Sequence, residues 1–478
     1  MSNVFATLST AGQSLGVFQD ALTTVQNNIS NSNTPGYASQ SVNFVTQPLD
    51  LLSGLVGGVA AKGLHSARDE YAEEEVRRQL STLGIYESQA SATSTIASNF
   101  DPSGNTGVPA ALNQLLNSFS AWSLDPNSDS TKQQVLGDAS SLATTVHQLA
   151  ASLTNNDQDL QGQIAGAVQQ VNQLTSQIQQ LNLAIGQTAS PGQAPDPGLD
   201  AQLHSDLQQL SELVDFSQVF QPNGTVTVVL SGGSPLVVGD QQFALSANAA
   251  VPAGSANPGA PPTMSVLDSN GNNITSQITG GKLGGLLDVH NRVMASILGD
   301  GSQAGSLNLF AKSLADTVNG ILQSGTVSVN AGAANGQALF TYDNTDATHA
   351  AASFAINSNL TTAGLAPVDS SGNANGNALK LASLANSITN GGVGGQTFAA
   401  YFGQIAQFVG NQNSTATTNQ NTQQQIVTQA ESLRDHASAV SLDAQAIQLQ
   451  QFQKSYEATA KLITVLNSVT ETTINMVQ

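Results

Sequence analysis

Residues 441–478 read SLDAQAIQLQQFQKSYEATAKLITVLNSVTETTINMVQ, with neither Gly nor Pro to interrupt a helix. Apolar and aromatic side chains recur every seven residues, with others three or four residues later: Leu442, Leu449, Phe452, Tyr456, Ile463, Leu466 and Ile474. Ser441 suits the N-cap, and Asp443 places negative charge at the positive end of the helix dipole. Because a lone helix would leave such a seam in water, the stretch predicts a long helix that packs against a partner.

A candidate partner lies at the other end of the chain, where a second heptad pattern begins at Met1. Its members beyond Met1 include Leu8, Leu15, Phe18, Leu22, Val25 and Ile29. The two patterns predict a chain that leaves a helical root and returns to it. They fit either an ordinary intramolecular coiled coil of the termini or helices that also assemble with other subunits. We take the side chains named in this and the preceding paragraph as a candidate subunit interface.

Composition limits the possible partners. The 478 residues include 12 Lys plus Arg against 32 Asp plus Glu, a net charge of −20, which argues against nucleic acid or an anionic membrane. Only 9% of residues are charged, so a surface rich in Ser, Thr, Asn and Gln can pack against copies of itself without strong repulsion. The absence of Cys excludes disulfides and thiol chemistry. No apolar run is long enough for a membrane span, and no secretory signal is recognisable.

Changes in periodicity predict a mainly α fold with inserted β domains. We expect long terminal coiled-coil-type helices, a rod-like helical domain and two small β-rich insertions. The assembly helices occupy 1–35 and 440–478, the rod domain 36–215, 281–323 and 397–439, and the insertions 216–280 and 324–396. The period changes from seven to two at Phe216, and Asn223-Gly224 between two strand-like runs predicts a β-hairpin. Further strands are expected at 235–238, 242–245 and 263–267, and at 326–329, 338–342 and 353–356.

Some local patterns carry predictions of their own. Residues 41–63 are apolar and Gly-rich, and we expect an extended connector with little regular structure. The charge run from Glu73 to Arg78 predicts a solvated helix face with ion pairs between successive turns. Trp122 is expected in the core with its N–H satisfied. A helix over 397–436 has a polar middle and is expected to pack against the helix that contains residues 164–185.

No pattern of catalytic or ligand-binding residues emerges. The six His lie outside metal-ligand spacing, and the His-Glu-x-x-His, Gly-x-Ser-x-Gly and Gly-x-Gly-x-x-Gly motifs are absent. Few charged side chains are available for acid–base chemistry. We therefore expect no enzyme, no catalytic residue, no cofactor and no metal site.

One motif near the N-terminus resembles a known family. Its residues are Asn27, Asn28, Ile29, Ser30 and Asn31, followed by Thr34, Pro35, Gly36 and Tyr37. This run resembles the N-terminal signature of bacterial flagellar rod, hook and hook-associated proteins. Pro35-Gly36 also suits the centre of a type II turn. Near the other terminus, Phe452-Gln453 stands where rod and hook proteins usually carry Gln-Arg, so the C-terminal helix is similar to that of the hook-associated members.

The resemblance implies a structural component of the flagellum, an adaptor at the junction of hook and filament on which the filament assembles. It further implies type III export in unfolded form without a cleaved signal, and a location outside the cell at that junction. The implied partners are further copies in a ring-like homo-oligomer, the hook protein, a second hook–filament junction protein and an export chaperone at the C-terminal helix. Nucleic acid and membrane insertion are not expected.

Two alternatives remain open from the residues. The chain could be a hook or rod axial protein, although Phe452-Gln453 and the long helix through 164–185 argue against it. It could instead be a secreted adhesin or wall-remodelling enzyme on an axial-protein scaffold, with residues 216–395 as the active part. Glycan hydrolysis or specific surface binding by these residues would support the second alternative.

Overall fold

A computed structural model describes residues 2–50, 55–100, 106–188 and 195–476. The chain forms two compact units, each built from segments that are far apart in the sequence. Unit 1 comprises residues 1–83, 171–244 and 423–478, and unit 2 comprises residues 84–170 and 245–422. Three long helices contribute residues to both: α2 (Glu70–Ala97), α4 (Asp129–Thr188) and α10 (Phe398–Ser438). The expectation of a mainly helical fold with small antiparallel β-sheets is confirmed.

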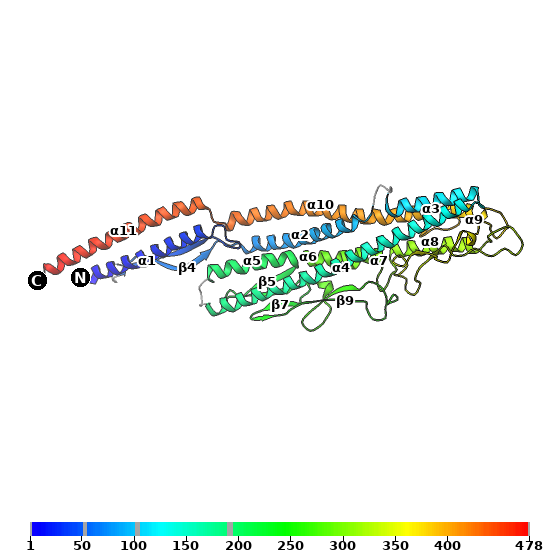
Figure 1. The fold of residues 1–478 in the computed structure, drawn as a ribbon. Helices are drawn as coiled ribbons and strands as arrows, with labels where there is room; N and C mark the ends of the chain where they lie inside the picture. Colours follow the sequence, from blue (N-terminus) through cyan, green and yellow to red (C-terminus); the bar gives the residue numbers. More distant parts are fainter. Residues whose placement is uncertain (1, 51–54, 101–105, 189–194, 477–478) are drawn as a thin grey trace. The chain divides into compact units, whose positions relative to one another are not determined.

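Unit 1 contains the two terminal helices as an antiparallel pair. The α1 helix (Ser2–Ser30) and the α11 helix (Leu442–Asn475) lie side by side, with both chain termini at the same end (Figure 1). Ser441 caps α11 as predicted, because its side chain accepts a hydrogen bond from the Ala444 N–H. The heptad patterns of the two termini therefore meet within one chain.

The expectation of an irregular connector over 41–63 is wrong. Strands β1 (Gln40–Thr46) and β4 (Val59–Ser66) form an antiparallel ladder with a bulge between Val42 and Phe44. Two short strands, β2 (Leu49–Asp50) and β3 (Leu55–Val56), pair between them. Both β1 and β4 contact α1, so packing against the helix stabilises a ladder whose Gly-rich sequence gives little strand signal.

A four-stranded antiparallel sheet follows in unit 1. Its order is β5 (Phe216–Phe220), β6 (Val226–Leu230), β7 (Pro235–Val238) and β8 (Gln241–Gln242), which confirms the hairpin predicted at Asn223-Gly224. The α5 helix (Pro197–Leu213) has Asp196 as its N-cap and Pro in its first turn. Both α4 and α5 contact the sheet: Asn182 bonds the backbone of Val226, and the His204 ring stacks on Phe220 at 5.3 Å.

Unit 2 consists mainly of helices packed around a buried apolar core, with short β-strands. Its helical segments are α3 (Gly107–Leu124), α6 (Gly281–Asp288), the π-helix η2 (Val289–Met294), α7 (Ala295–Leu298), α8 (Ser306–Gln323), α9 (Gly376–Ser383) and the 3-10 turns η1 (Thr275–Gln277) and η3 (Thr362–Gly364). Trp122 is fully buried and donates its N–H to the Pro126 carbonyl, as expected. A Cβ on Gly285 would lie 2.1 Å from Ser88 Oγ and 2.5 Å from the Ile85 carbonyl oxygen, so α6 approaches α2 through glycine.

The strands of unit 2 differ from those expected. Strand β9 (Ser246–Ala250) pairs with β10 (Thr263–Leu267). Of the strand expected over 242–245, residue 242 belongs to β8 and 243–245 lie outside any strand. Within 324–396 the paired strands are shorter than expected: β11 (Phe340–Thr341) pairs with β12 (Ala355–Ile356). The α9 helix in this segment was not predicted from the sequence. Asparagine side chains replace much of a ladder here, since Asn319 of α8 bonds the backbone of Leu339 and Phe340.

The contacts of α10 include several with α2. In unit 1, Val76, Leu80 and Leu83 of α2 form a buried cluster with Val427 and Ala430. Gln423 also donates to the Gln79 carbonyl and side chain. The polar middle of α10 therefore has a hydrogen-bond partner on α2, while its packing against the helix through 164–185 stays a prediction.

Candidate functional site

A buried asparagine joins the ends of the two terminal helices. The Asn28 amide nitrogen donates to the Gln40 carbonyl at 2.7 Å and to Gln445 Oε1 at 2.9 Å. Its Oδ1 accepts from the Gln40 N–H and from the Tyr37 hydroxyl, each at 2.9 Å. Asn28 is 0% exposed and makes four hydrogen bonds, the full capacity of its amide. We call Asn28, Tyr37, Gln40 and Gln445 the asparagine hub.

The turn after α1 places the rest of the family motif. The Tyr37 N–H donates to the Thr34 carbonyl, and Gly36 has φ +73°, as the predicted type II turn requires. A Cβ at position 36 would lie 2.2 Å from the Ala201 carbonyl oxygen, so only glycine lets the turn lie against α5. Thr34 donates to Asn31 Oδ1. The remaining motif side chains, Asn27, Ile29, Ser30 and Pro35, lie exposed on the surface.

An aromatic residue of β1 bridges the two helices. The Phe44 ring lies 6.4 Å from the Phe18 ring of α1 and 5.7 Å from the Phe452 ring of α11, centroid to centroid. Such tilted pairs contribute favourably beyond the area they bury. Phe18 and Phe452 were both expected in the interface, whereas Phe44 was not, because its stretch gave no strand signal.

The expected interface residues fall into three groups. Val25 is buried, while Ile29, Leu442 and Ile474 are exposed. The others are half-buried: Leu8, Leu15, Phe18, Leu22, Leu449, Phe452, Tyr456, Ile463 and Leu466. The buried side of α1 instead passes through Ala11, Val17, Ala21, Thr24, Val25 and Asn28. Because α1 contacts both α11 and the β1–β4 ladder, its buried face is rotated away from the leucine series.

Beside the asparagine hub lies a buried cluster of charged residues. Arg68 donates to Glu73 at 2.7 Å, to Asp200 at 2.9 Å and to the Gly36 carbonyl at 2.6 Å. Arg77 and Arg434 each lie 4.0 Å from the other Glu73 oxygen. The expectation of a solvated face is therefore wrong for Glu73 and Arg77, which are 5% and 4% exposed, because α5 and the end of α10 cover that side of α2.

His204 of α5 completes this charged cluster as a neutral residue. Burial, together with the Arg68 and Arg77 guanidiniums, holds the pKa of His204 well below its usual 6.5. These effects on the pKa outweigh the opposite influence of two carboxylates, those of Glu70 and Asp200, each of which lies 3.6 Å from Nε2 of His204. Burial likewise lowers the pKa of Arg77, whose Nε and Nη2 have no hydrogen-bond partner. The cluster thus fixes α2, α5 and the turn after α1 without the donor and acceptor pair that acid–base catalysis needs.

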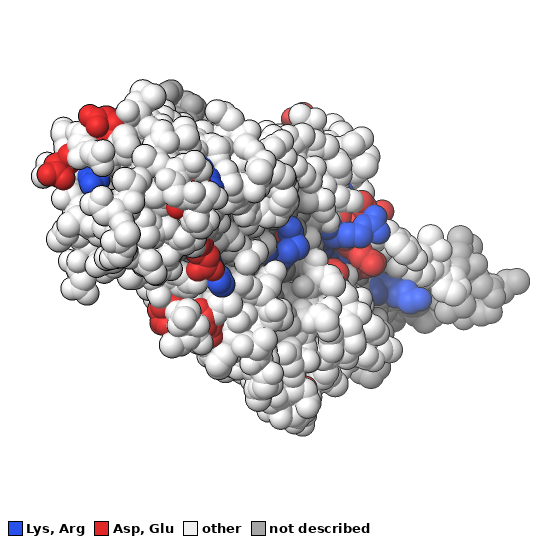
Figure 2. Space-filling model, turned by 90° about the vertical axis from the view of Figure 1, so that its right-hand side faces the viewer, with Lys and Arg blue, Asp and Glu red and all other residues white. Residues whose placement is uncertain are grey.

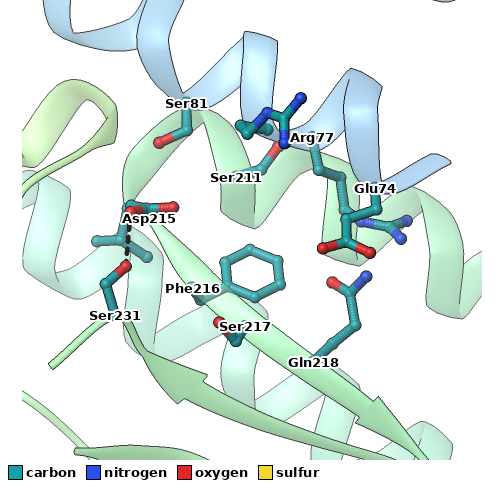
Figure 3. A pocket seen from close by; sticks show the side chains of 11 residues that line it. Glu74, Arg77, Ser81, Ser211, Asp215, Phe216, Ser217, Gln218 and Ser231 are labelled. Atoms are coloured by element: carbon teal, nitrogen blue, oxygen red, sulfur yellow. Dashed lines mark hydrogen bonds between the residues drawn. The ribbon is translucent and has the colours of Figure 1, made fainter. Parts of the chain in front are cut away.

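A cavity of about 180 Å³ lies next to the charged cluster, between α2 and β5. Figure 3 shows Glu74, Arg77 and Ser81 of α2 on one side and Phe216, Ser217 and Gln218 of β5 on the other. The Asp215 carboxylate on its wall accepts a 2.5 Å hydrogen bond from Ser231. Its mixed acidic and basic lining favours neither an anion nor a cation. Within the described ranges, no group of three or more His, Asp or Glu is arranged to hold a metal ion.

Sequence reasoning missed three residues that connect the helices: Gln445, Phe44 and Arg68. Gln445 carried a signal, because it lies three residues after Leu442, the position that Phe452 and Leu466 occupy in later heptads. A polar residue at such a seam position often fixes register. Arg68 gave no local signal, since its partners lie in α2 and α5. None of the helices in the described part combines the length and apolar character needed to cross a membrane.

Comparisons with known proteins agree with this architecture. A family model described as the helical domain of the flagellar hook-associated protein FlgK matches residues 93–340. Flagellar hook-associated protein 1 of Bacillus subtilis (strain 168) is 26% identical over 99% of each chain. The protein of that name from Escherichia coli (strain K12) is 24% identical over 98% of this chain and 99% of its own. The solved flagellar hook junction protein FlgK from Burkholderia pseudomallei has a similar fold, with a TM-score of 0.58 at 17% identity, covering 75% of this chain and 99% of that one.

Proposed function

Because the chain belongs to the family of the flagellar hook-associated protein FlgK, we propose that it is the adaptor on which the filament assembles at the end of the hook. It is a structural component of the flagellum and not an enzyme. In this role the terminal helices would take part in assembly.

The observation that carries the proposal is the apolar surface left on α11. Six of its large apolar side chains are exposed although the helix is already paired with α1: Leu442, Ile447, Leu462, Val465, Val469 and Ile474. Leu462, Val465 and Val469 are 48%, 58% and 46% exposed and follow one another at helical spacing. Contiguous exposed apolar surface of this kind marks a protein–protein contact.

Copies of the same chain fit this surface. The half-buried leucines of α1 and the exposed stripe of α11 give the α1–α11 pair two apolar surfaces. The helix pair of a neighbouring copy can cover them, and repetition of this contact would form a ring-like homo-oligomer. Only 9% of the residues are charged, which suits close packing between copies despite the net charge of −20. The face in Figure 2, which is not that of α1 and α11, is likewise mostly uncharged. Among the candidate interface residues, those with exposed or half-buried side chains would make the contact.

Further partners belong to the same proposal. The flagellum is the place where the protein works, and we place it outside the cell at the hook–filament junction after type III export. The hook protein on one side and a second hook–filament junction protein on the other would be its neighbours. An export chaperone would cover the exposed apolar stripe of α11 before assembly, because that stripe otherwise faces water.

Complementation of a deletion strain tests the proposal. The Leu462→Asp variant places a charge in the exposed stripe at a side chain that is 48% exposed, whereas Leu15 and Ile463 are half-buried. Asn467→Asp is the matched control, because it adds the same charge on another exposed side of α11. Electron microscopy of the flagella and an assay of flagellin in the medium are the measurements.

We expect bare hooks and flagellin lost to the medium in the deletion strain and with Leu462→Asp, and attached filaments with Asn467→Asp. Absence of the hook itself in the deletion strain would assign the chain to the hook or rod. Normal filaments with Leu462→Asp would remove the exposed stripe of α11 from the assembly contact.

A further inference from the structure

His290 is a buried histidine in unit 2 that the assembly proposal does not use. It lies in the π-helix η2 and is 3% exposed. The wider π turn lets two neighbouring residues make separate tertiary contacts: His290 faces Asp157 of α4, and Asn291 faces β10. Three elements therefore meet at these two side chains.

Both ring nitrogens of His290 face oxygen atoms. Nδ1 lies 2.9 Å from Asn291 Oδ1. Nε2 lies 3.2 Å from Asp157 Oδ1 in an ion pair that is not aligned as a linear hydrogen bond, and it has no other partner. A neutral imidazole has one N–H and one lone pair, so one of these two nitrogens would point its lone pair at an oxygen.

The two oxygens cannot turn away to relieve such a clash. Asn291 Oδ1 accepts from the Met264 N–H at 3.0 Å, and the Asn291 amide nitrogen donates to the Met264 carbonyl at 2.8 Å, so a flipped amide would lose both bonds. The other oxygen of Asp157 accepts from Gln161 at 2.9 Å. Asp157 is itself 5% exposed, and a buried carboxylate requires a cation beside it.

The described residues that line the space beside the pair offer His290 as the cation. A cavity of about 10 Å³ lies beside the pair, and the titratable side chains on its wall are Asp157, His290 and Asp300. Asp300 is held by N–H groups of Ser302 and Gln303. Burial opposes protonation of His290, but the Asp157 carboxylate and the Asn291 side-chain oxygen outweigh it, so the pKa of His290 is raised above 6.5.

We propose that His290 is a proton-dependent latch that holds η2 and β10 against α4 while its imidazole is charged. Loss of the proton leaves the Asp157 carboxylate buried without a neighbouring cation. It also points the lone pair of one His290 ring nitrogen at the oxygen of Asp157 or of Asn291. The docking of the β9–β10 hairpin on the helices then weakens. The sign follows from linkage: the latch contributes fully below the ordinary pKa of 6.5 and is lost as the pH rises through the folded pKa of His290.

NMR titration of histidine Cε1–H groups in the full-length chain tests the latch. We expect a His290 midpoint above 6.5 and a lower midpoint in Asp157→Asn. A midpoint at or below 6.5 in the wild-type chain would overturn the proposal, and so would a midpoint unmoved by Asp157→Asn. These readouts do not depend on flagellar assembly, so they stand apart from the proposed adaptor role.

Thermal unfolding as a function of pH gives a second, independent measurement. Above pH 6.5 the wild-type Tm should fall more steeply than that of His290→Gln, while His65→Gln, at an exposed position, should follow the wild type. Equal slopes in wild type and His290→Gln would contradict the latch. If His290→Gln fails to fold, the titration of the wild-type chain decides alone.

Discussion

Unit 2 and the α1–α11 pair of unit 1 are stabilised in different ways. Among the described residues, the fully buried aromatic side chains belong to unit 2, including Trp122, Phe119, Phe310 and Phe398. The α11 helix instead has Gln445 as its buried residue and leaves six large apolar side chains exposed. Apolar burial dominates folding free energy, so unit 2 carries its stability within itself, whereas the terminal pair obtains only part of it from its own chain.

The difference indicates a division of tasks. In the terminal pair, the asparagine hub and the Phe18–Phe44–Phe452 contacts fix which residues of the two helices lie opposite each other. Polar groups at a helix seam specify register at some cost in stability. The remaining apolar burial is then available from neighbouring subunits. A pair that is aligned but incompletely buried suits a segment that must assemble with copies.

The largest expected effect lies in the core of unit 2. Phe310 is fully buried and packs edge-on against Phe398 and Phe402. Phe310→Ala should lower the free energy of unfolding of unit 2 by about 3–5 kcal/mol, the usual cost of a cavity left by a buried aromatic ring. Denaturant unfolding, with hydrogen exchange to separate the two units, is the measurement.

Phe452→Ala is the matched change in the terminal pair. Because Phe452 is only half-buried, we expect a clearly smaller loss in the isolated chain, confined to α1 and α11. A loss as large as that of Phe310→Ala would break the comparison, since it would mean that the terminal pair is already stable by itself.

An intermediate effect is expected at the asparagine hub. Asn28→Asp keeps the shape of the side chain. Its amide NH2 group, which donates to the Gln40 carbonyl and to Gln445 Oε1, is replaced by a carboxylate oxygen that cannot donate to either. Each buried group left unpaired costs about 1–3 kcal/mol. Protease cleavage within α11 should therefore accelerate, while unit 2 remains intact.

Asn27→Asp is the control for this change, because it alters the exposed neighbouring asparagine of the same motif. It should leave the cleavage rate of α11 close to that of the wild type. Equal sensitivity of both variants would show that added charge near the end of α1, rather than the hub, governs the pair.

The smallest expected effect is the pH response of unit 1, which has the opposite sign to that of the latch in unit 2. His204 is neutral in the folded state because its pKa is lowered by burial and by Arg68 and Arg77. The unfolded chain therefore binds the extra proton first, and stability is lost as the pH falls below 6.5, by at most about 1.4 kcal/mol per pH unit.

Unfolding of unit 1 between pH 7.5 and 5.5, followed by hydrogen exchange in α5, measures this response. The wild-type chain should lose protection toward acidic pH, and His204→Gln should lose less. A wild-type unit 1 that gains stability toward acidic pH would mean that Glu70 and Asp200 dominate His204 after all.

Much of the local structure was predictable from neighbouring residues. Ser441 as an N-cap, the turn at Pro35-Gly36 and the hairpin at Asn223-Gly224 all depend on side-chain and backbone chemistry within a few positions. The β1–β4 ladder and the short strands of 324–396 were not predictable in this way. Contacts with α1, and with Asn319 of α8, decide them.

The candidate site shows the same division. Its motif residues and the two heptad patterns were visible in the sequence, but the roles of Gln445, Phe44 and Arg68 were not. The charged run was assigned to solvent, although Glu73 and Arg77 are buried. Periodicity shows that a helix has an apolar side, whereas the polar residues that become buried depend on which distant segments cover them.

By itself, the sequence determined the long helices, the cap of α11, the turns at Pro35-Gly36 and Asn223-Gly224, and the resemblance of the two termini to flagellar axial proteins. These features follow from local propensity and spacing. Only the tertiary structure decided that Asn28 meets Gln445, that Arg68 joins α2 to α5, and that α11 keeps an uncovered apolar stripe. The physical reason is that burial and pairing depend on segments that lie hundreds of residues apart and come together only in the folded chain.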